Sequence, residues 1–306
     1  MHCLVLGGTG FIGTHLVAAL AAAGHDVHVL SRSAGRGPTL PSVTYIAADF
    51  HDRQALRRAH AGVEVAYHLI GTSLPSNADA PADVQGNVLG TLGVLDAARD
   101  ARVRRVVFVS SGGTVYGDPR GLPIPESHAT NPICAYGITK LTIEKFLHAY
   151  ERLHGLDYRV LRLANPYGPG QRADRPQGVV GVFLDRLLRR APIEIWGDGE
   201  VIRDYVYVRD TVKAMTRAAE HEGPSRLFNV GSGVGISLKS LLKEIGAVLE
   251  CEPVVTYRSA RTFDVPANIL DVTLAREELG WCPDTSLQDG LRLTANWLRD
   301  RVAAVS

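Results

Sequence analysis

The chain has 306 residues, with 33 Lys and Arg against 32 Asp and Glu, and 45% of its residues are hydrophobic. A chain of this length usually forms about two domains and buries a large core unaided, which excludes a disulfide scaffold, a collagenous repeat and a disordered tail. The net charge of +1 provides no basic surface for nucleic acid. We therefore expect small molecules or a second copy of the chain as partners.

The four cysteines are scattered through the chain: Cys3, Cys134, Cys251 and Cys282. They form no CxxC pair and the eleven histidines show no ligand spacing, so we expect inert thiols in a reducing cytoplasm, no metal site, and a core imidazole at His68. The apolar segment 16–24 could belong to a signal peptide, but no basic segment precedes it and the glycines at 7, 8 and 10 interrupt the apolar stretch before it, so a folded strand, turn and helix fits better. No apolar run approaches the roughly 20 residues of a membrane span.

The first half of the chain alternates between predicted strands and helices. The apolar run 3–8 predicts a short buried strand, and 11–23 predicts a helix that Gly24 would end. Further strands are predicted at 26–32, 43–49, 64–70, 105–111 and 157–165, and further helices at 52–60, 84–100 and 135–154. Such alternation indicates right-handed βαβ units, so we predict an α/β fold with a Rossmann-type, doubly wound parallel sheet.

The character of the sequence changes near Asn165, where loops rich in Gly and Pro begin. We expect a dinucleotide-binding Rossmann domain over 1–165, to which the chain returns around 203–232. A smaller C-terminal α/β domain over 166–306 would close over a substrate at the carboxyl ends of the strands.

Gly7, Gly10 and Gly13 follow the first predicted strand and open the first predicted helix. Only glycine lets the backbone turn this tightly and approach a pyrophosphate, whose charge would then lie at the helix N-terminus. An ordinary tight turn uses the same residue, but the strand, turn and helix in succession favour a dinucleotide.

The end of the second predicted strand bears on the choice between NAD and NADP. About 20 residues after such a glycine loop, an acidic residue usually holds the adenosine ribose. This chain has Ser31 and Arg32 there, which could hold a 2′-phosphate, so NADP stays open unless Arg32 stacks on adenine or is only solvated. Asp49 and Phe50, after the third strand, are placed to meet the adenine edge, although an isolated Asp more often caps a helix.

Tyr136 and Lys140 lie four residues apart and therefore share one face of a predicted helix. A tyrosine with an ordinary pKa of about 10 is a poor base at neutral pH, and a nearby ammonium favours its phenolate. The pair could shuttle a proton beside a nicotinamide, although the same spacing occurs by chance on solvated helices. Ser110, Ser111 and Thr114 offer hydroxyls at a strand end that could bind a substrate oxygen.

An ordered series of motifs covers nearly the whole chain: GGTGFIG, HLIG, NVLGT, SSGGTVYG, YGITK, NPYGPGQ, RDYVYV and FNVGSG. In this order they resemble the extended short-chain dehydrogenase/reductase family, its NAD-dependent epimerases/dehydratases, and above all the UDP-glucose 4-epimerase branch. The resemblance implies an enzyme that binds NAD and a UDP-linked nucleotide sugar, and the cysteines favour the cytoplasm as its location. It also implies a homodimer formed through the helices predicted at 84–100 and 135–154.

The resemblance implies that Tyr136 is the catalytic base and Lys140 its electrostatic partner and a ribose ligand. A Ser or Thr near residue 111 would be the third member. The usual hydroxyl position holds Gly112, so Ser111 is the first choice for that role and Thr114 the second. Further cofactor contacts are implied for Phe11, Ile12, Leu69, Ile70, Gly71 and Ser110.

By the same resemblance, Asn165 would contact the substrate diphosphate and Arg203 would pair with its oxygens. Arg261 and Asp264 would close over the diphosphate and the uridine ribose, since a guanidinium fork matches phosphate oxygens. Each arginine could instead form a surface ion pair. The uracil would be flanked by Val179, Val180, Ile195 and Trp196, although a tryptophan is more often core.

Gly113 and Thr114 reduce the number of reactions that this family resemblance allows. Sugar 4,6-dehydratases of this family carry an Asp-Glu pair before the Val-Tyr, and UDP-sugar decarboxylases a Glu, because their reactions need an additional acid or base. We therefore expect NAD-dependent C4 epimerisation of UDP-glucose, UDP-galactose or an N-acetylated relative, through a transient 4-keto intermediate. An NADPH-dependent 4-ketoreductase, which Ser31 and Arg32 would suit, is the alternative; a dehydratase or a non-catalytic dinucleotide sensor has less support.

Overall fold

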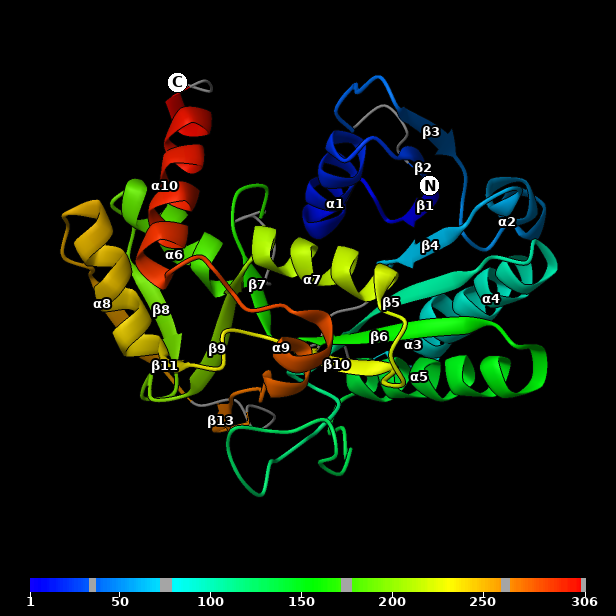
Figure 1. Ribbon diagram of the computed structural model, residues 1–306. Helices are drawn as coiled ribbons and strands as arrows, with labels where there is room; N and C mark the ends of the chain where they lie inside the picture. The colour runs from blue at the N-terminus through cyan, green and yellow to red at the C-terminus, as the bar shows by residue number, and fades with distance from the viewer. Residues whose placement is uncertain (33–36, 72–78, 172–177, 260–264, 304–306) are drawn as a thin grey trace.

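The computed structural model describes residues 1–32, 37–71, 79–171, 178–259 and 265–303 (Figure 1). Its largest element is a seven-stranded sheet with the order β10-β6-β5-β4-β1-β2-β3, and every adjacent pair is parallel. The strands are β1 (His2–Leu6), β2 (Asp26–Ser31), β3 (Val43–Ala47), β4 (Val65–His68), β5 (Arg105–Ser111), β6 (Asp157–Leu163) and β10 (Leu227–Val230). The predicted doubly wound α/β fold is confirmed.

Helices cover both faces of this sheet, which explains why its strands are apolar on both sides. Cys3 and Val5 face a core shared with α1 (Phe11–Ala22) and α7 (Val208–Glu220). Leu4 and Leu6 point the opposite way, into a core with α2 (Arg53–His60), α4 (Gly90–Asp100) and α5 (Ala135–His154). In Figure 1, α7 lies on one side of the sheet and α4 and α5 on the other.

The helix predicted over 84–100 is not uniform. The short helix α3 (Ala80–Asp83) leads into a π-helical segment, η2 (Val84–Leu89), and only then into α4. The predicted helical stretch is confirmed over 84–100, but its first six residues are π-helical, which hydrophobic periodicity does not distinguish from an α-helix. Such segments are frequent near functional sites. The predicted helix 135–154 is confirmed, and Gly155 ends it at φ +69°.

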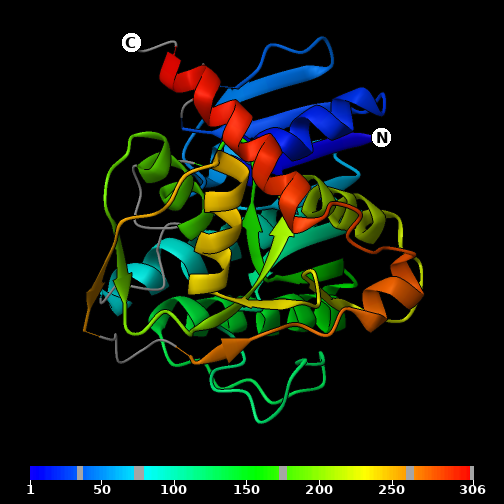
Figure 2. The same cartoon turned by 90° about the vertical axis from the view of Figure 1, so that its left-hand side faces the viewer.

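The second half of the chain builds two smaller sheets. One joins β11 (Gly235–Ser237), β9 (Ile202–Tyr207), β13 (Ala267–Asn268) and β7 (Asn165–Tyr167), and the other pairs β12 (Val255–Arg258) with β8 (Ile193–Trp196). Their core includes side chains from α6 (Val179–Leu188), α8 (Leu238–Leu249) and α10 (Leu287–Ala303). Figure 2 shows α8 and α10 on the face turned to the viewer.

The chain returns to the first sheet after β9. Helix α7 packs against α1, β10 pairs with β6 at the edge of the seven-stranded sheet, and α9 (Thr273–Leu279) contacts β10. Residues 208–230 are therefore structurally part of the first unit, while the division at residue 165 stays a prediction. Among the helices in the described ranges, none combines the length and the apolar character needed to cross a membrane.

Candidate functional site

The glycine loop lies between the carboxyl end of β1 and the first turn of α1. Gly7 has φ +87°, and its carbonyl accepts a hydrogen bond from the Gly10 amide at 3.0 Å. A Cβ at Gly13 would lie 2.2 Å from the Gly7 carbonyl oxygen, so the helix can approach the loop this closely only with glycine there. The N-terminus of α1, which has no acidic residue in its first turn, is thereby presented as an anion site.

Two strand ends lie beside this loop. The hydroxyls of Ser31 and Thr9 share a hydrogen bond of 2.7 Å, which ties the end of β2 to the glycine loop. Hydrogen bonds from the His51 amide and ring hold the pKa of Asp49 below its ordinary value, and Arg32 adds a smaller effect. Arg32 and Asp49 are exposed, whereas Phe50 is buried.

Leu69, Ile70 and Gly71 follow β4 on the other side of the glycine loop. The Leu69 amide donates to the Leu6 carbonyl at 3.0 Å. A Cβ at Gly7 would lie 3.3 Å from Ile70, and one at Gly71 would lie 3.9 Å from Lys140 Nζ. This segment therefore connects the proposed pyrophosphate cradle to the Tyr136–Lys140 region.

Lys140 projects from α5 toward the carboxyl end of the sheet. Its Nζ donates to the Val109 carbonyl at 2.8 Å and lies 5.7 Å from the centre of the Tyr136 ring. Burial lowers the pKa of Lys140 to about 8, although Glu144 acts to raise it. Tyr136 is partly exposed, but the surrounding atoms desolvate its hydroxyl. This desolvation raises the pKa of Tyr136 to about 12, and the charge of Cys134 adds to the effect. The phenol alone is therefore a weak base, and further positive charge beside it is needed to favour the phenolate.

The turn after β5 carries both candidate hydroxyls. The amides of Thr114 and Val115 donate to the Ser111 carbonyl at 3.3 and 3.1 Å. A Cβ at Gly137 would lie 2.7 Å from the Thr114 carbonyl oxygen, so this turn touches α5 directly beside Tyr136. Thr114 Oγ1 is shielded from solvent and makes no hydrogen bond within the described residues. Ser111 is partly exposed.

Gly112 occupies the position where the resemblance leads one to expect a hydroxyl. A Cβ there would lie 2.6 Å from a Leu270 methyl carbon and 3.2 Å from the Arg162 carbonyl oxygen. The side of the turn at residue 112 is thus filled by Leu270, a residue from the second half of the chain. This packing gives a physical reason for the departure from the family pattern.

A buried ion pair behind these residues escaped the sequence analysis. Ser110 donates its hydroxyl to Glu144 Oε1 at 2.5 Å, and Arg162 donates to both carboxylate oxygens of Glu144, at 3.1 and 2.7 Å. The Arg162 guanidinium lies 4.7 Å from the Tyr116 ring centre. The spacing of Lys140 and Glu144, one helical turn apart, was the available signal. Ser110, predicted to contact the cofactor, thus has a carboxylate as its partner.

On the substrate side, Asn165 and Arg203 lie on two paired strands, β7 and β9. The Asn165 amide donates to the Asp204 carbonyl at 2.8 Å. Arg203 donates to the carbonyls of Ile202 and Val265 at 2.8 and 2.7 Å. These contacts with the backbone hold both side chains within the four-stranded sheet.

The residues predicted to flank a uracil divide into two groups. Val180 and Ile195 are buried in the hydrophobic core of the second half, whereas Val179 is half-buried and Trp196 is 43% exposed. Only the latter two side chains offer surface to a ligand. Arg261 and Asp264 lie outside the described residues.

His15 joins the two sides of the site. Its Nε2 lies 2.7 Å from the carbonyl oxygen of Pro169, and its ring meets Phe11 edge to face, with 6.1 Å between centres. The loop that follows Asn165 therefore lies against the first turns of α1. A ligand at the helix N-terminus and a ligand on that loop would be neighbours.

Comparison with known proteins identifies this arrangement. The family model described as the NAD dependent epimerase/dehydratase family matches residues 3–231. The chain belongs to this family. Its sequence is 37% identical over 311 residues to the UDP-glucose 4-epimerase of Mycolicibacterium smegmatis, a match that covers 98% of this chain and 99% of that protein.

Solved structures of family members agree with this assignment. UDP-glucose 4-epimerase from Thermotoga maritima, solved with UDP-glucose, is 36% identical, has a TM-score of 0.93, and is matched over 99% of this chain and 100% of that one. The UDP-glucose 4-epimerase of Thermus thermophilus, solved as a complex with NAD, is 32% identical, with a TM-score of 0.91 and coverage of 98% and 99%. The family predicted from the motif series is thus confirmed.

Proposed function

We propose that this family member is an NAD-dependent nucleotide-sugar 4-epimerase that interconverts UDP-glucose and UDP-galactose or their N-acetylated relatives. The observation that carries the proposal is the Tyr136–Lys140 pair beside a turn with Gly113 and Thr114 and no carboxylate. Two carboxyl groups would be expected there for an elimination. The 4-epimerases among the relatives support the same reaction.

The residues around the glycine loop fit NAD. A Cβ at Gly13 would fill the space against Gly7, so these glycines maintain the cradle that a pyrophosphate needs. Ser31 and the partly shielded end of β2 would hold the adenosine ribose without a carboxylate, and Asp49 would lie near the adenine edge. NAD held there would supply reversible hydride transfer at C4 of the sugar.

Tyr136 acts as the general base and general acid of the reaction. As phenolate it takes the proton of the sugar 4-hydroxyl as the 4-keto intermediate forms, and it returns this proton after the sugar has turned. Lys140, whose ammonium lies near the ring, favours the phenolate and would also bind the nicotinamide ribose. Ser111 or Thr114 would donate a hydrogen bond to the same sugar oxygen.

The nucleotide end of the substrate must stay bound while the sugar rotates. We assign this to Asn165 and Arg203 for the diphosphate, with Trp196 and Val179 beside the base. Arg261 and Asp264 complete the proposed set. A firm grip at the diphosphate and few contacts at the sugar let the intermediate present either face without release.

We also propose a homodimer in the cytoplasm. Exposed apolar side chains on η2 and α5 support the contact: Val84 is 45% exposed, Leu89 54% and Ile138 50%. The free cysteines, among them the buried Cys3, suit a reducing compartment. Sedimentation velocity at several protein concentrations tests the dimer, and a single monomeric species throughout would contradict it.

The test of the reaction uses the purified full chain and UDP-glucose or UDP-N-acetylglucosamine, with NAD but no reductant. We expect a mixture of the two C4 epimers, with the same final ratio when the reaction starts from the galacto sugar. Turnover that consumes stoichiometric NADPH and a 4-keto sugar would instead favour the ketoreductase. No change in either sugar nucleotide would contradict the epimerase, and no consumption of NADPH with a 4-keto sugar would contradict the ketoreductase.

A further inference from the structure

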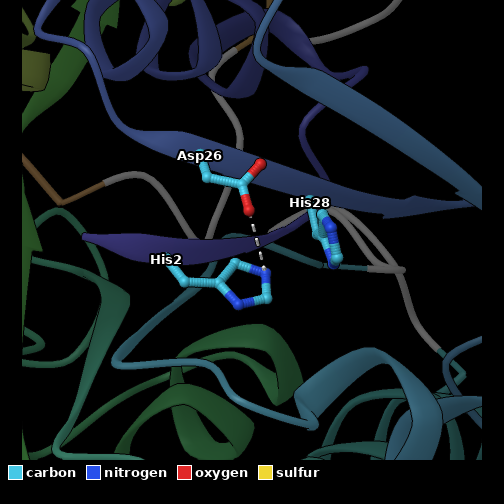
Figure 3. A group of neighbouring side chains, drawn as sticks. All are labelled: His2, Asp26 and His28. Atoms are coloured by element: carbon cyan, nitrogen blue, oxygen red, sulfur yellow. Dashed lines mark ion pairs between the residues drawn. The ribbon is translucent and has the colours of Figure 1, made fainter.

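Three potential metal ligands meet at the amino end of the seven-stranded sheet, opposite the glycine loop. His2 on β1 pairs in register with Asp26 on β2, and Leu4 pairs with His28. Because side chains alternate along a strand, His2, Asp26 and His28 all project from the same face of the sheet. Figure 3 shows the three side chains gathered there, and their ligand atoms lie within 4.8 Å of one another.

The His2 ring is held in one orientation by a backbone carbonyl. Its Nδ1 lies 3.1 Å from the carbonyl oxygen of Gly62, which can only accept a hydrogen bond, so Nδ1 carries the hydrogen. In the neutral ring this leaves a lone pair on Nε2. A backbone carbonyl that fixes the other ring nitrogen is the usual arrangement for a histidine that binds a metal.

The free nitrogen faces the carboxylate. His2 Nε2 is shielded from solvent, makes no hydrogen bond to the described residues, and lies 3.9 Å from Asp26 Oδ2. That distance is long for a charge-assisted hydrogen bond, which is typically about 2.7–2.9 Å. At the tetrahedral angle, Zn–N and Zn–O bonds of about 2.0–2.2 Å place two ligand atoms about 3.3–3.6 Å apart, so a small side-chain shift would bring both atoms to one zinc ion.

His28 supplies the third ligand. Its ring meets that of His2 edge to face, with 4.3 Å between centres, so a small side-chain adjustment brings one of its nitrogens to the same ion. Glu64 adds negative charge nearby, because its Oε1 accepts a hydrogen bond from the His2 backbone amide at 2.9 Å. The surroundings thus favour a cation.

We propose that His2, Asp26 and His28 form a binding site for a divalent transition metal, with Zn²⁺ as the best match. Two imidazoles and one carboxylate are ligands that zinc accepts, and the exposed Asp26 side leaves a fourth position for water. The ion would link β1 to β2 at the end of the sheet remote from the cofactor. Its role would be to stabilise the fold, and the proposal is independent of the sugar substrate.

The site was not predicted from the sequence because its ligands have no local spacing. His2 and Asp26 are 24 residues apart, and only the parallel register of β1 and β2 brings them together. A search for paired ligands within one turn or one loop therefore cannot detect them.

The experiment is a calorimetric titration of the EDTA-treated, buffer-exchanged full chain with ZnCl₂. We expect one Zn²⁺ per chain, and at least about tenfold weaker binding for His2→Gln, Asp26→Asn and His28→Gln. His148→Gln removes an exposed histidine on α5 and is the matched control, which should bind as the parent does. The absence of binding, or binding that none of the three ligand substitutions weakens, would overturn the proposal.

Two further measurements guard against a folding artefact. Zn²⁺ should raise the melting temperature of the parent and of His148→Gln but not of the ligand variants, since an ion that binds only the folded state stabilises it. Co²⁺ in place of Zn²⁺ should give the intense visible absorption of a tetrahedral site in the parent. If Co²⁺ bound to the parent gives only the weak absorption of the hydrated ion, the assigned coordination is wrong.

Discussion

Two polar groups of the seven-stranded sheet, the Asp157 carboxylate at its amino end and the Thr114 hydroxyl after its carboxyl end, differ in how they are satisfied. At the amino end, Asp157 accepts hydrogen bonds from Arg105 at 2.6 Å and from Arg159 at 2.7 Å, and Arg226 lies 3.1 Å away. At the carboxyl end, Thr114 Oγ1 is shielded and without a partner among the described residues. Since an unpaired buried polar atom costs free energy, the Thr114 hydroxyl, like His2 Nε2 at the proposed metal site, is a candidate position for a ligand.

The same contrast applies to pKa values. Burial alone would raise the pKa of Asp157, but hydrogen bonds from Arg105 and Arg159 outweigh it and hold the pKa below its ordinary value of 3.8. Lys140 has no comparable compensation: burial lowers its pKa to about 8. A group whose pKa lies closer to neutral pH than its ordinary value is a candidate for chemistry, whereas a fully paired carboxylate is a candidate for stability.

The largest expected effect is that of Tyr136→Phe at the carboxyl end. Loss of the proton-transferring hydroxyl should lower the kcat for epimerisation by about 10²–10⁴-fold while NAD binding and the melting temperature stay close to those of the parent. Tyr150→Phe is the matched control on the same helix, because within the described residues its hydroxyl donates to Asp96 on α4, at 2.8 Å. A Tyr136→Phe protein with parental kcat would remove the catalytic assignment.

Glu144→Gln tests a residue that has both roles, because Glu144 pairs with the buried Arg162 and also acts on the pKa of Lys140. It leaves the buried Arg162 without a matching charge, which should cost about 3 kcal/mol of unfolding free energy. Because Glu144 raises the pKa of Lys140, its loss should also move the fall of activity with rising pH to lower pH. Chemical denaturation and the pH profile of kcat/KM measure the two effects.

The control for this substitution is Glu151→Gln, farther along α5 and only half-buried. It should change neither the pH profile nor the stability by more than about 0.5 kcal/mol. A Glu144→Gln enzyme that is destabilised yet keeps the parental pH profile would show that the carboxylate supports the fold without acting on Lys140.

Asp157→Asn should affect stability alone. A broken buried ion pair costs about 3–5 kcal/mol, and we expect about 2 kcal/mol because the Asp157 side chain is 23% exposed. The charge of Asp157 stabilises the fold above its ordinary pKa, and this contribution is lost as the pH falls through the lower pKa of the folded state. The variant should therefore show a weaker decline in stability at acid pH, while its specific activity at neutral pH is unchanged.

Asp185→Asn is a matched control for this substitution. Asp185 is also 23% exposed and pairs with Arg189 one helical turn away, a type of contact worth about 0.3–0.5 kcal/mol. Equal melting temperatures for the two variants would contradict the structural role assigned to the Asp157 cluster.

The sequence allowed local features to be predicted and left the long-range ones open. The bounds of the strand 105–111 and the helix 135–154 are as predicted, because apolar periodicity and a terminal glycine are local signals. The glycine loop was likewise predictable from spacing. The roles of Gly112 and of the Glu144–Arg162 pair could not be predicted from the sequence. Gly112 packs against Leu270, and Glu144 pairs with a residue of strand β6, so both roles depend on contacts between residues that are distant in the chain.

Packing also explains which predicted site residues reach the surface. Trp196 and Ile195 are adjacent in β8, and alternation along the strand turns one outward and buries the other. The sequence alone could not indicate which, because both residues are apolar. The same applies to Val179 and Val180 at the start of α6, of which only Val180 is fully buried.

The smallest expected effect, that of Thr114→Val, tests most directly whether an unpaired hydroxyl beside the sheet is a ligand position. If Thr114 Oγ1 binds a sugar oxygen of the substrate, Thr114→Val should lower kcat/KM several-fold. The substitution should also stabilise the free protein by up to about 1 kcal/mol, because it removes an unsatisfied buried hydroxyl. Thr91→Val is the counterpart: the Thr91 hydroxyl donates to the Asn87 carbonyl at 2.6 Å and lies 2.8 Å from His68 Nε2, so its loss should destabilise the protein. We would measure thermal melting and steady-state kinetics for Thr114→Val, Thr91→Val and Ser111→Ala. These measurements decide which hydroxyl donates a hydrogen bond to the substrate. If Thr114→Val changes neither quantity while Ser111→Ala lowers kcat/KM, the role belongs to Ser111, and the unpaired hydroxyl of Thr114 is not a ligand position.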